Sequence, residues 1–545
     1  MKLAFWVFAS ASILPMSCGS QPSASGPSRS DRSTVGGDPR LDMPVVPLSP
    51  ESPSSRTRPT PHVPGHRPST DGGADAALPD SGGGPPPDAA VVGTWQALVH
   101  APSFYPDTPL LLTDGSIMVH ALDDGSNWWR LTPDAFGSYL DGSWSQLQPM
   151  PSGDQPQFFA SAVLADGRVV VIGGEYNQGA TAETILGAIY DPRANAWTPI
   201  GTPGWPDVGD SPSVVLPDGT FMIGSAASAD NALFDARALT WRSTGAGKAD
   251  QNSEEGWTLL PNGKVLTVDV FSPGGSELYT PATGTWTGAG STGVTLPAPN
   301  PVYEIGPAVL MPNGSVFATG GTSHTAIYSA AGTWSAGPDF PQVPEGQLDI
   351  ADGPAVLLPN GKVLCVASAG YYQMGAYFLE FDGSALSVVT PIPNAANDSS
   401  YNIFLFLLPT GQIMAIDGSQ DIEIYTPGGS PDPSWAPSIT SSPATVVRGT
   451  TYPLVGTQLN GLSQGVAYGD DYQGATNYPI VRITNDTSGH VFYGVTHDHS
   501  SMAVATGALP VSTLFEAPPR TEVGASHLVV VANGIASASV AITVQ

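Results

Sequence analysis

The chain has 545 residues, of which 41% are apolar, so it is long enough for a large core or for more than one domain. Lys and Arg number 18 against 47 Asp and Glu, which gives a formal net charge of −29. A nucleic-acid interface needs basic side chains to neutralise phosphates, so this balance excludes nucleic acid as a main partner. Acidity of this kind fits solubility, cation binding or a cationic ligand.

The first 18 residues have the pattern of an export signal. Lys2 supplies a positive charge, residues 3–16 are almost wholly apolar, and small residues surround Cys18. The segment before Cys18 resembles a bacterial lipobox, although Pro15 and Met16 stand where Leu and a small residue are usual. We expect residues 1–18 to be a lipoprotein-type signal with lipidation at Cys18, which would make an outer-membrane or cell-surface lipoprotein touching the membrane only through its lipid. Cleavage after residues 9–11 and free secretion is the alternative.

Residues 19–92 are rich in Pro, Ser, Gly and Asp and have hardly an apolar cluster. Such a segment cannot bury enough surface to offset its ordering entropy, so we expect a disordered tether.

An internal repeat dominates the remaining sequence. Apolar residues flank an Asp-Gly, Asn-Gly or Thr-Gly pair seven times, with turn glycines at Gly115, Gly167, Gly219, Gly263, Gly314, Gly361 and Gly411. Successive glycines are 52, 52, 44, 51, 47 and 50 residues apart, close to the length of a kelch repeat. Each copy predicts a β-hairpin whose glycine adopts a positive φ.

A third strand with an aromatic residue and a fourth with Trp follow most hairpins, as in Tyr279 and Trp286. Four strands per repeat predict the blades of a seven-bladed β-propeller over residues 93–435. The seventh repeat lacks a fourth strand, and the segment around Trp95 matches one, so we expect the N-terminal strand to complete the last blade. In the sixth repeat, Ser387 stands where a Trp is expected.

Residues 436–545 alternate polar and apolar side chains between turn signals. This pattern predicts six to eight short antiparallel strands in an immunoglobulin-like β-sandwich. The fold class is therefore all-β.

The repeats followed by this C-terminal segment resemble the galactose oxidase/kelch family, a seven-bladed propeller with an early-set sandwich. The resemblance covers residues 93–545 and is most specific at residues 401–409 and 524–545. It implies a site near the propeller axis, where the family's oxidases hold copper and a tyrosyl radical crosslinked to a cysteine.

Carried over residue by residue, the copper site is mostly missing. The family's axial tyrosine falls on Tyr401, but the histidine after it falls on Asn402. The radical tyrosine falls on Phe158, which has no phenol to oxidise.

Of the remaining two positions, one lacks the family's residue and one retains it. The crosslinking cysteine falls on Tyr105 or Pro106, and the histidine that reaches the axis from a C-terminal loop falls on His497. The resemblance therefore implies the fold and argues against copper-radical chemistry.

Polar residues recur just before the predicted inner strands, where a propeller would bring them to one mouth of its channel. They are Tyr105, Asp107, Asp210, Glu254, Glu255, Glu304, Asp349, Asp352, Asp398 and Tyr401, with Asn402 beside the last. Converging carboxylates repel one another unless a cation or water relieves them.

Hard oxygen ligands favour Ca²⁺, and we take Glu254, Glu304 and Asp352 as candidate metal ligands. His497 and His499 share a face of a strand and would permit Zn²⁺ or Mn²⁺. A solvated ring of acidic loops is the alternative.

Two function classes remain open. The first is a displayed recognition module that binds a glycan or an extracellular protein, with exposed aromatic side chains such as Tyr371, Tyr372, Trp128 and Trp129 stacking on sugars. The second is an extracellular enzyme with a metal or an acid/base pair at the acidic mouth. Cys365 lies in an apolar run and is expected to be buried and inert.

Overall fold

The computed structural model describes residues 93–470 and 472–545, which lie in one compact unit. The predicted signal, the lipidation of Cys18 and the tether fall outside the described residues. Within the described part, no helix is long and apolar enough to cross a membrane.

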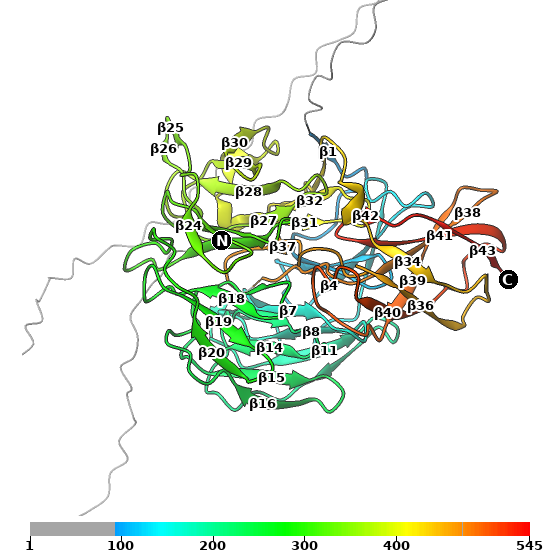
Figure 1. Ribbon diagram of the computed structural model, residues 1–545, viewed down its shortest axis with the longest axis horizontal. Coiled ribbons are helices and arrows are strands. Elements are labelled where there is room, and N and C mark those ends of the chain that lie inside the picture. The colour runs from blue at the N-terminus through cyan, green and yellow to red at the C-terminus, as the bar shows by residue number, and fades with distance from the viewer. Residues whose placement is uncertain (1–92, 471) are drawn as a thin grey trace, which may run out of the picture. The chain divides into compact units, whose positions relative to one another are not determined.

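The described chain is an all-β protein in which seven antiparallel sheets follow one another, numbered here sheets 1–7 in chain order (Figure 1). Sheet 1 contains β2 (Pro106–Leu111), β3 (Ile117–Ala121), β4 (Trp128–Thr132) and β5 (Ser143–Gln146). Sheet 2 contains β7 (Ala160–Val163), β8 (Val169–Ile172), β11 (Gly187–Asp191) and β12 (Ala196–Pro199). Sheet 3 contains β13 (Ser213–Val215), β14 (Phe221–Gly224), β15 (Asn231–Asp235) and β16 (Thr240–Thr244).

The other four sheets have the same plan. Sheet 4 contains β17 (Thr258–Leu259), β18 (Val265–Val268), β19 (Ser276–Thr280) and β20 (Thr285–Gly288). Sheet 5 contains β21 (Ile305–Leu310), β22 (Val316–Gly320), β23 (Ala326–Tyr328) and β24 (Trp334–Ala336). Sheet 6 contains β27 (Ala355–Leu357), β28 (Val363–Ser368), β29 (Ala376–Phe381) and β30 (Leu386–Val389), joined by β37 (Val466–Ala467). Sheet 7 contains β31 (Phe404–Leu407), β32 (Ile413–Ile416), β33 (Glu423–Thr426) and β1 (Thr94–Ala97).

Short elements lie between these sheets. They are β6 (Pro156–Gln157), β9 (Tyr176–Asn177), β10 (Ala180–Thr181), β25 (Gln342–Val343), β26 (Gly346–Gln347) and the 3₁₀ turns η1 (Ala395–Asn397), η2 (Ser400–Asn402) and η3 (Pro433–Trp435).

The first two strands of each sheet are joined by the predicted glycine turn. All seven turn glycines have φ between 75° and 86°, a region that side chains with a Cβ rarely adopt, which confirms the predicted hairpins. The flanking strands are buried, as expected for runs that are apolar on both faces.

The first strands of the sheets pack side by side, which is consistent with a β-propeller. Contacts join β2 to β7, β7 to β13, β17 to β21, β21 to β27, β27 to β31, and β31 back to β2. One apolar cluster joins sheets 3 and 4 through Val214, Met222 and Leu259.

The third and fourth strands pair an aromatic residue with Trp in five sheets. The pairs are Tyr190 with Trp197, Phe234 with Trp241, Tyr279 with Trp286, Tyr328 with Trp334, and Tyr425 with Trp95. The last pair confirms that the N-terminal strand completes sheet 7. In sheet 6, however, Leu386 lies opposite Phe381, so Leu386 rather than Ser387 occupies the Trp position.

The C-terminal region forms a second sheet system at one side of the seven sheets (Figure 1). It contains β34 (Ser438–Ser441), β35 (Thr445–Val446), β36 (Thr451–Thr457), β38 (Ile480–Asn485), β39 (Val491–His497), β40 (Pro510–Glu516), β41 (Gly524–Ala532), β42 (Ile535–Ala536) and β43 (Val540–Val544). These nine strands exceed the six to eight predicted, and β35 pairs with β43 in parallel, so the sheet is not wholly antiparallel. Its own core contains Leu454, Val481 and Phe515.

The C-terminal region covers the ends of the sheets that carry the glycine turns. The Thr496 amide donates to Thr113 O at 3.1 Å, the His499 amide donates to Ala165 O at 2.9 Å, and Met502 donates to Pro217 O at 2.9 Å. We call this end the turn end; the segments that precede the inner strands lie at the opposite end, the loop end.

Candidate functional site

Residues 464–470 and 472–479 leave the C-terminal region and run along the inner strands. At the turn end, the Tyr478 hydroxyl donates to Leu111 O at 2.6 Å, and the Tyr472 hydroxyl donates to Pro109 O at 2.7 Å. The strand β37 pairs with β27, and the Tyr468 hydroxyl donates to Tyr401 O at 2.5 Å. The segment therefore reaches from the turn end to the residues that precede β31 at the loop end.

The tip of this segment meets three predicted site residues. A Cβ added to Gly469 would lie 2.6 Å from Asp352 Oδ1, so only glycine fits so close to that carboxylate. Oxygens of Glu254, Glu304 and Asp352 all lie within 4.8 Å of one another. The three residues are 5%, 4% and 1% exposed.

A second set shares one member with the first. Oxygens of Asp210, Glu254 and Asp470 also lie within 4.8 Å of one another, and Asp470 is 3% exposed. Five carboxylates from the loops before four different sheets and from the C-terminal segment therefore meet at the loop end. We call these five residues the axial cluster.

The axial cluster is electrostatically unfavourable when every member is ionised. Burial, followed by the charges of Glu304, Asp470, Asp210 and Asp352, raises the pKa of Glu254 well above its ordinary value. Either a proton or a cation has to relieve this repulsion, because buried charges persist only when they are compensated.

The backbone holds two of the carboxylates in an unusual conformation. Glu254 and Asp352 have φ of 62° and 61°, in the left-handed region that costs a residue with a Cβ about 1–2 kcal/mol. Both residues precede inner strands, so these two turns aim side chains of different sheets at one point.

Tyrosines complete the surroundings of the cluster. The Tyr372 hydroxyl donates to Glu304 Oε1, and the Tyr372 ring lies edge-on to Tyr401 with centroids 5.2 Å apart. Tyr401, predicted as a binding residue, is 7% exposed.

The structure brings together some predicted site residues and separates others. Glu254, Glu304, Asp352 and Asp210 meet as predicted. Glu255 instead pairs with Lys248 at 2.9 Å, and its side chain belongs to a different group of carboxylates.

The remaining predicted binding residues lie outside the axial cluster. Burial raises the pKa of Asp349 to about 7, but Asp349 is absent from the close carboxylate groups of the described residues. Tyr105 is 49% exposed, and the Asn402 amide donates to Ser399 O at 3.0 Å within the turn η2.

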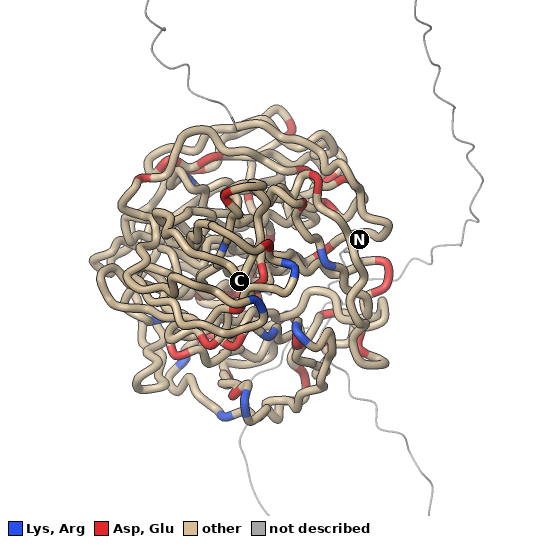
Figure 2. The backbone as a smooth tube through the Cα atoms, turned by 90° about the vertical axis from the view of Figure 1, so that its right-hand side faces the viewer, with Lys and Arg blue, Asp and Glu red and all other residues tan. Residues whose placement is uncertain are grey.

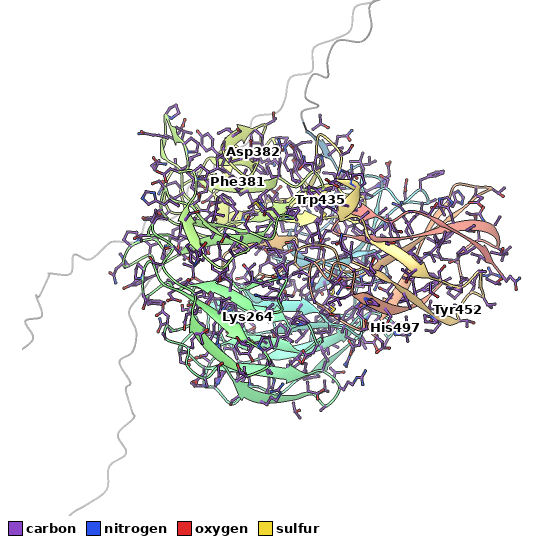
Figure 3. The ribbon with its side chains drawn as sticks, in the orientation of Figure 1. Lys264, Phe381, Asp382, Trp435, Tyr452 and His497 are labelled. Atoms are coloured by element: carbon purple, nitrogen blue, oxygen red, sulfur yellow. The ribbon has the colours of Figure 1, made fainter. Side chains whose placement is uncertain are left out.

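The prediction that His497 reaches the axis is wrong. His497 ends β39 in the C-terminal sheet (Figure 3), and His499 donates its amide to Ala165 beside a glycine turn, so both lie at the turn end. His497 Nδ1 is 2.7 Å from Asp498 Oδ2, while burial lowers the pKa of His499 to about 3. These two histidines therefore join no close metal-ligand group with the axial carboxylates in the described residues.

Asp470 was not identified from the sequence. It lies in a polar stretch flanked by Tyr468 and Tyr472 within an otherwise irregular segment. Acidic residues between two tyrosines, outside the glycine-turn repeats, were the sequence signal that could have pointed to Asp470.

The donor set does not fit the copper centre that the fold resemblance implies. Carboxylates and a phenol are hard oxygen donors, whereas copper sites in proteins favour imidazole and sulfur ligands. Phe158, onto which the resemblance places the radical tyrosine, has no phenol, and Cys365 is buried within β28, where burial raises the pKa of its thiol to about 12.

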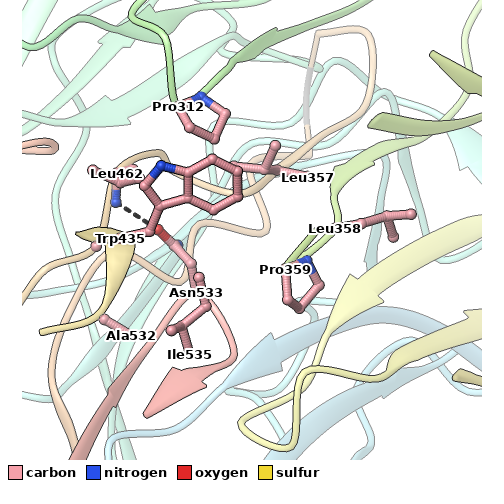
Figure 4. A pocket seen from close by; sticks show the side chains of 10 residues that line it. Pro312, Leu357, Leu358, Pro359, Trp435, Leu462, Ala532, Asn533 and Ile535 are labelled. Carbon is pink, nitrogen blue, oxygen red and sulfur yellow. Dashed lines mark hydrogen bonds between the residues drawn. The ribbon is translucent and has the colours of Figure 1, made fainter. Parts of the chain in front are cut away.

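The apolar pocket shown in Figure 4 is a packing contact. Trp435 lies there among Pro312, Leu357 and Leu462, where the glycine turns of sheets 5 and 6 meet the C-terminal region. Its one polar side chain, Asn533, already accepts from the Leu462 amide at 2.8 Å. The pocket therefore offers no group for chemistry.

No model of a protein family and no curated protein matches this chain. Among solved structures it is similar to a fungal alcohol oxidase of the AA5 family in complex with copper, with 15% identity, a TM-score of 0.48, and coverage of 84% of this chain and 100% of that chain. A streptogramin B lyase has 11% identity, a TM-score of 0.45, and coverage of 62% and 99%. The structure of YjhT has 14% identity, a TM-score of 0.37, and coverage of 54% and 99%. Similarities at this level do not indicate a shared activity.

Proposed function

We propose that this protein is an exported recognition module whose axial cluster binds a divalent cation, Ca²⁺ in the first place. Its fold would be a seven-bladed kelch-type propeller over residues 93–435, followed by an immunoglobulin-like early-set sandwich over residues 436–545. Lipidation at Cys18 would display it on the outer membrane or cell surface; free secretion is the alternative.

The convergence of the five carboxylates of the axial cluster, four of them buried and Asp210 half-buried, supports this proposal. Ca²⁺ takes six to eight oxygen ligands at about 2.3–2.6 Å, so its ligand oxygens lie about 3–5 Å apart. The oxygens of Glu254, Glu304 and Asp352 already lie within 4.8 Å of one another. A bound cation would also remove the repulsion that raises the pKa of Glu254.

The ligand surface of the proposed module is the loop end around the cluster. Tyr105 and Met374 are 49% and 61% exposed there, and Tyr372 links this surface to Glu304. Aromatic rings beside polar loops suit a glycan or an extracellular protein ligand. The cation would hold the loops in register rather than contact the ligand, because the carboxylates are buried.

Thermal unfolding of residues 91–545 in CaCl₂ and in EDTA tests the cation. A ligand that binds only the native state raises the melting temperature with its concentration. We expect the triple variant Glu254→Gln, Glu304→Gln, Asp352→Asn to lose the axial part of this response, so that Ca²⁺ raises its melting temperature less than that of the wild type, and to melt in EDTA at least as high as the wild type.

The matched control neutralises three exposed acidic residues, Asp141→Asn, Asp218→Asn and Asp382→Asn, and should keep the response. Equal melting of the wild type in Ca²⁺ and EDTA would remove the cation from the proposal. An equal loss of response in both triple variants would do the same.

The raised pKa of Glu254 favours a second candidate, an extracellular hydrolytic enzyme. A buried carboxyl group whose pKa is raised holds its proton more tightly and can serve as a general acid beside a second carboxyl group such as that of Asp352. Hydrolysis of a glycoside or ester panel by the wild type, lost in folded Glu254→Gln, would favour the enzyme over the binding module.

A further inference from the structure

A second group of carboxylates lies in the segments that flank the first two strands of sheet 4, apart from the axial cluster. Oxygens of Asp250, Glu255 and Asp269 lie within 4.8 Å of one another, and all three residues are buried. Glu254 and Glu255 are consecutive, but Glu254 belongs to the axial cluster and Glu255 to this group. We call Asp250, Glu255 and Asp269 the inner trio.

One lysine only partly compensates the inner trio. Lys248 Nζ lies 2.9 Å from Glu255 Oε1 and 2.7 Å from Glu277 Oε2, and the lysine side chain is 1% exposed. With Asp250 and Asp269, four buried carboxylates therefore surround one ammonium group. Three negative charges remain to be compensated when all four are ionised.

Hydrogen bonds hold the first two members in place. The Thr267 hydroxyl donates to Glu255 Oε2 at 3.1 Å. The amides of Phe271 and Ser272 donate to Asp250 Oδ2 at 2.8 and 3.1 Å. Asp250 and Glu255 are thus oriented without help from Asp269.

Asp269 is the member that needs a ligand. It is 6% exposed, and its buried Oδ1 has no hydrogen-bond partner among the described residues. Leaving a buried acceptor unsatisfied costs about 1–3 kcal/mol, more for a charged group. Burial, then the Glu277 carboxylate, raises the pKa of Asp269 to about 7, as expected for a charge that lacks a counter-ion.

We propose that the inner trio is a second cation site, in which Asp250, Glu255 and Asp269 bind one Ca²⁺ ion. All of its donors are carboxylate oxygens, the ligand type that Ca²⁺ prefers. Lys248 holds Glu277 Oε2 and Glu255 Oε1, which leaves Glu255 Oε2 and the two aspartates as ligands for the ion. Bound there, the cation would fasten the segment before β17 to the loop between β18 and β19 and so stiffen sheet 4.

Sheet 7 repeats part of this arrangement and provides an internal comparison. Asp398 and Asp417 lie 13 residues before and six after Gly411, as Asp250 and Asp269 do around Gly263. Ile403, however, stands where sheet 4 has Glu255. Among the described residues, no close group of three possible ligands forms in sheet 7. The inner trio therefore depends on Glu255, the carboxylate that sheet 7 lacks.

The test is the number of Ca²⁺ ions bound per chain, measured by equilibrium dialysis of residues 91–545 in physiological salt. We expect two ions for the wild type, one for Asp269→Asn, two for the register-matched control Asp417→Asn, and one for the axial variant Glu254→Gln/Asp352→Asn. Melting in EDTA checks that each variant is folded.

The outcomes separate this site from the axial one. One ion in the wild type that is lost in Asp269→Asn and kept in the axial variant supports the inner trio and removes the axial site. An unchanged ion count in Asp269→Asn, or an equal loss in Asp417→Asn, overturns the inner trio.

A second measurement needs no change to the carboxylates. The Trp286 ring centroid lies 5.2 Å from Lys248 Nζ, so bound Tb³⁺ should emit when this indole is excited. Trp286→Phe should reduce the sensitised emission more than Trp241→Phe, the equivalent change in sheet 3. Equal emission from the two variants would place the ion elsewhere and overturn the proposal.

Discussion

Trp95 of β1 lies directly opposite Tyr425 of β33, and the two ring centroids are 4.8 Å apart. The indole Nε1 also donates to Thr390 O at 2.8 Å, which ties the N-terminal strand to the end of sheet 6. Residues more than 300 positions apart in the sequence therefore finish one sheet.

Removal of the N-terminal strand should destabilise the protein. Deleting residues 93–100 leaves the buried strand β33 with an unpaired edge, which promotes aggregation. Trp95→Ala, a milder change to a half-buried ring, should lower the free energy of unfolding by about 1–3 kcal/mol. Chemical denaturation measures the effect, with the exposed neighbour Gln96→Ala as the control. A soluble 101–545 protein that melts like the wild type would contradict the structural role of β1.

The glycine turns should differ in their tolerance of alanine. Gly115 and Gly263 have φ of 75° and 77°, so each Ala variant should lose about 1–2 kcal/mol from the backbone conformation alone. A Cβ at Gly115 would also lie 2.5 Å from the Tyr493 ring, whereas at Gly263 the nearest atom is 3.3 Å away. Gly115→Ala should therefore be clearly more destabilising in urea unfolding. Equal losses would show that Tyr493 does not press on this turn.

Glu423 should make stability fall as the pH rises. It is 1% exposed, and burial followed by Asp421, Asp417 and Asp398 raises its pKa to about 8, above the ordinary value of 4.5. Between these two pH values, Glu423 holds a proton in the native state that it has released in the unfolded chain. The contribution of Glu423 to the free energy of unfolding therefore falls by about 1.4 kcal/mol for each pH unit. It is fully present below pH 4.5 and lost above pH 8.

Glu423→Gln removes this titration, so the stability of the variant relative to the wild type should increase from pH 5 to pH 8 in EDTA. Urea unfolding at several pH values provides the measurement. Glu345→Gln is the control, because Glu345 is exposed and the Tyr377 hydroxyl lowers its pKa instead. A pH-independent difference for Glu423→Gln would mean that Glu423 is ionised throughout.

Cys365 should be unreactive in the native protein. Its residue is fully buried, and burial raises the pKa of the thiol to about 12, so the reactive thiolate is scarce near neutral pH. A thiol reagent should modify residues 91–545 only after unfolding in guanidinium. Rapid modification without denaturant would show that β28 opens under native conditions.

The sequence by itself determined the local design of the sheets. An Asp-Gly, Asn-Gly or Thr-Gly pair between apolar runs predicts a tight turn with positive φ, and the structure has that turn at all seven glycines. Strand pairing of the N-terminal segment was predictable because Trp95 carries the same aromatic pairing signal as Trp286 and Trp334. The meeting of Glu254, Glu304 and Asp352 followed from their common position before inner strands.

Only the tertiary structure decided which C-terminal residues reach the loop end. His497 ends β39, in which the neighbouring Thr496 amide donates to Thr113 beside a glycine turn, whereas Asp470 lies on the segment that runs along the inner strands. Contacts between an irregular segment and residues hundreds of positions away leave no periodic pattern in the sequence. The sequence therefore could not show that Asp470, and not His497, reaches the loop end. The packing also assigned the consecutive residues Glu254 and Glu255 to different groups of carboxylates, because the left-handed turn at Glu254 directs the two side chains apart.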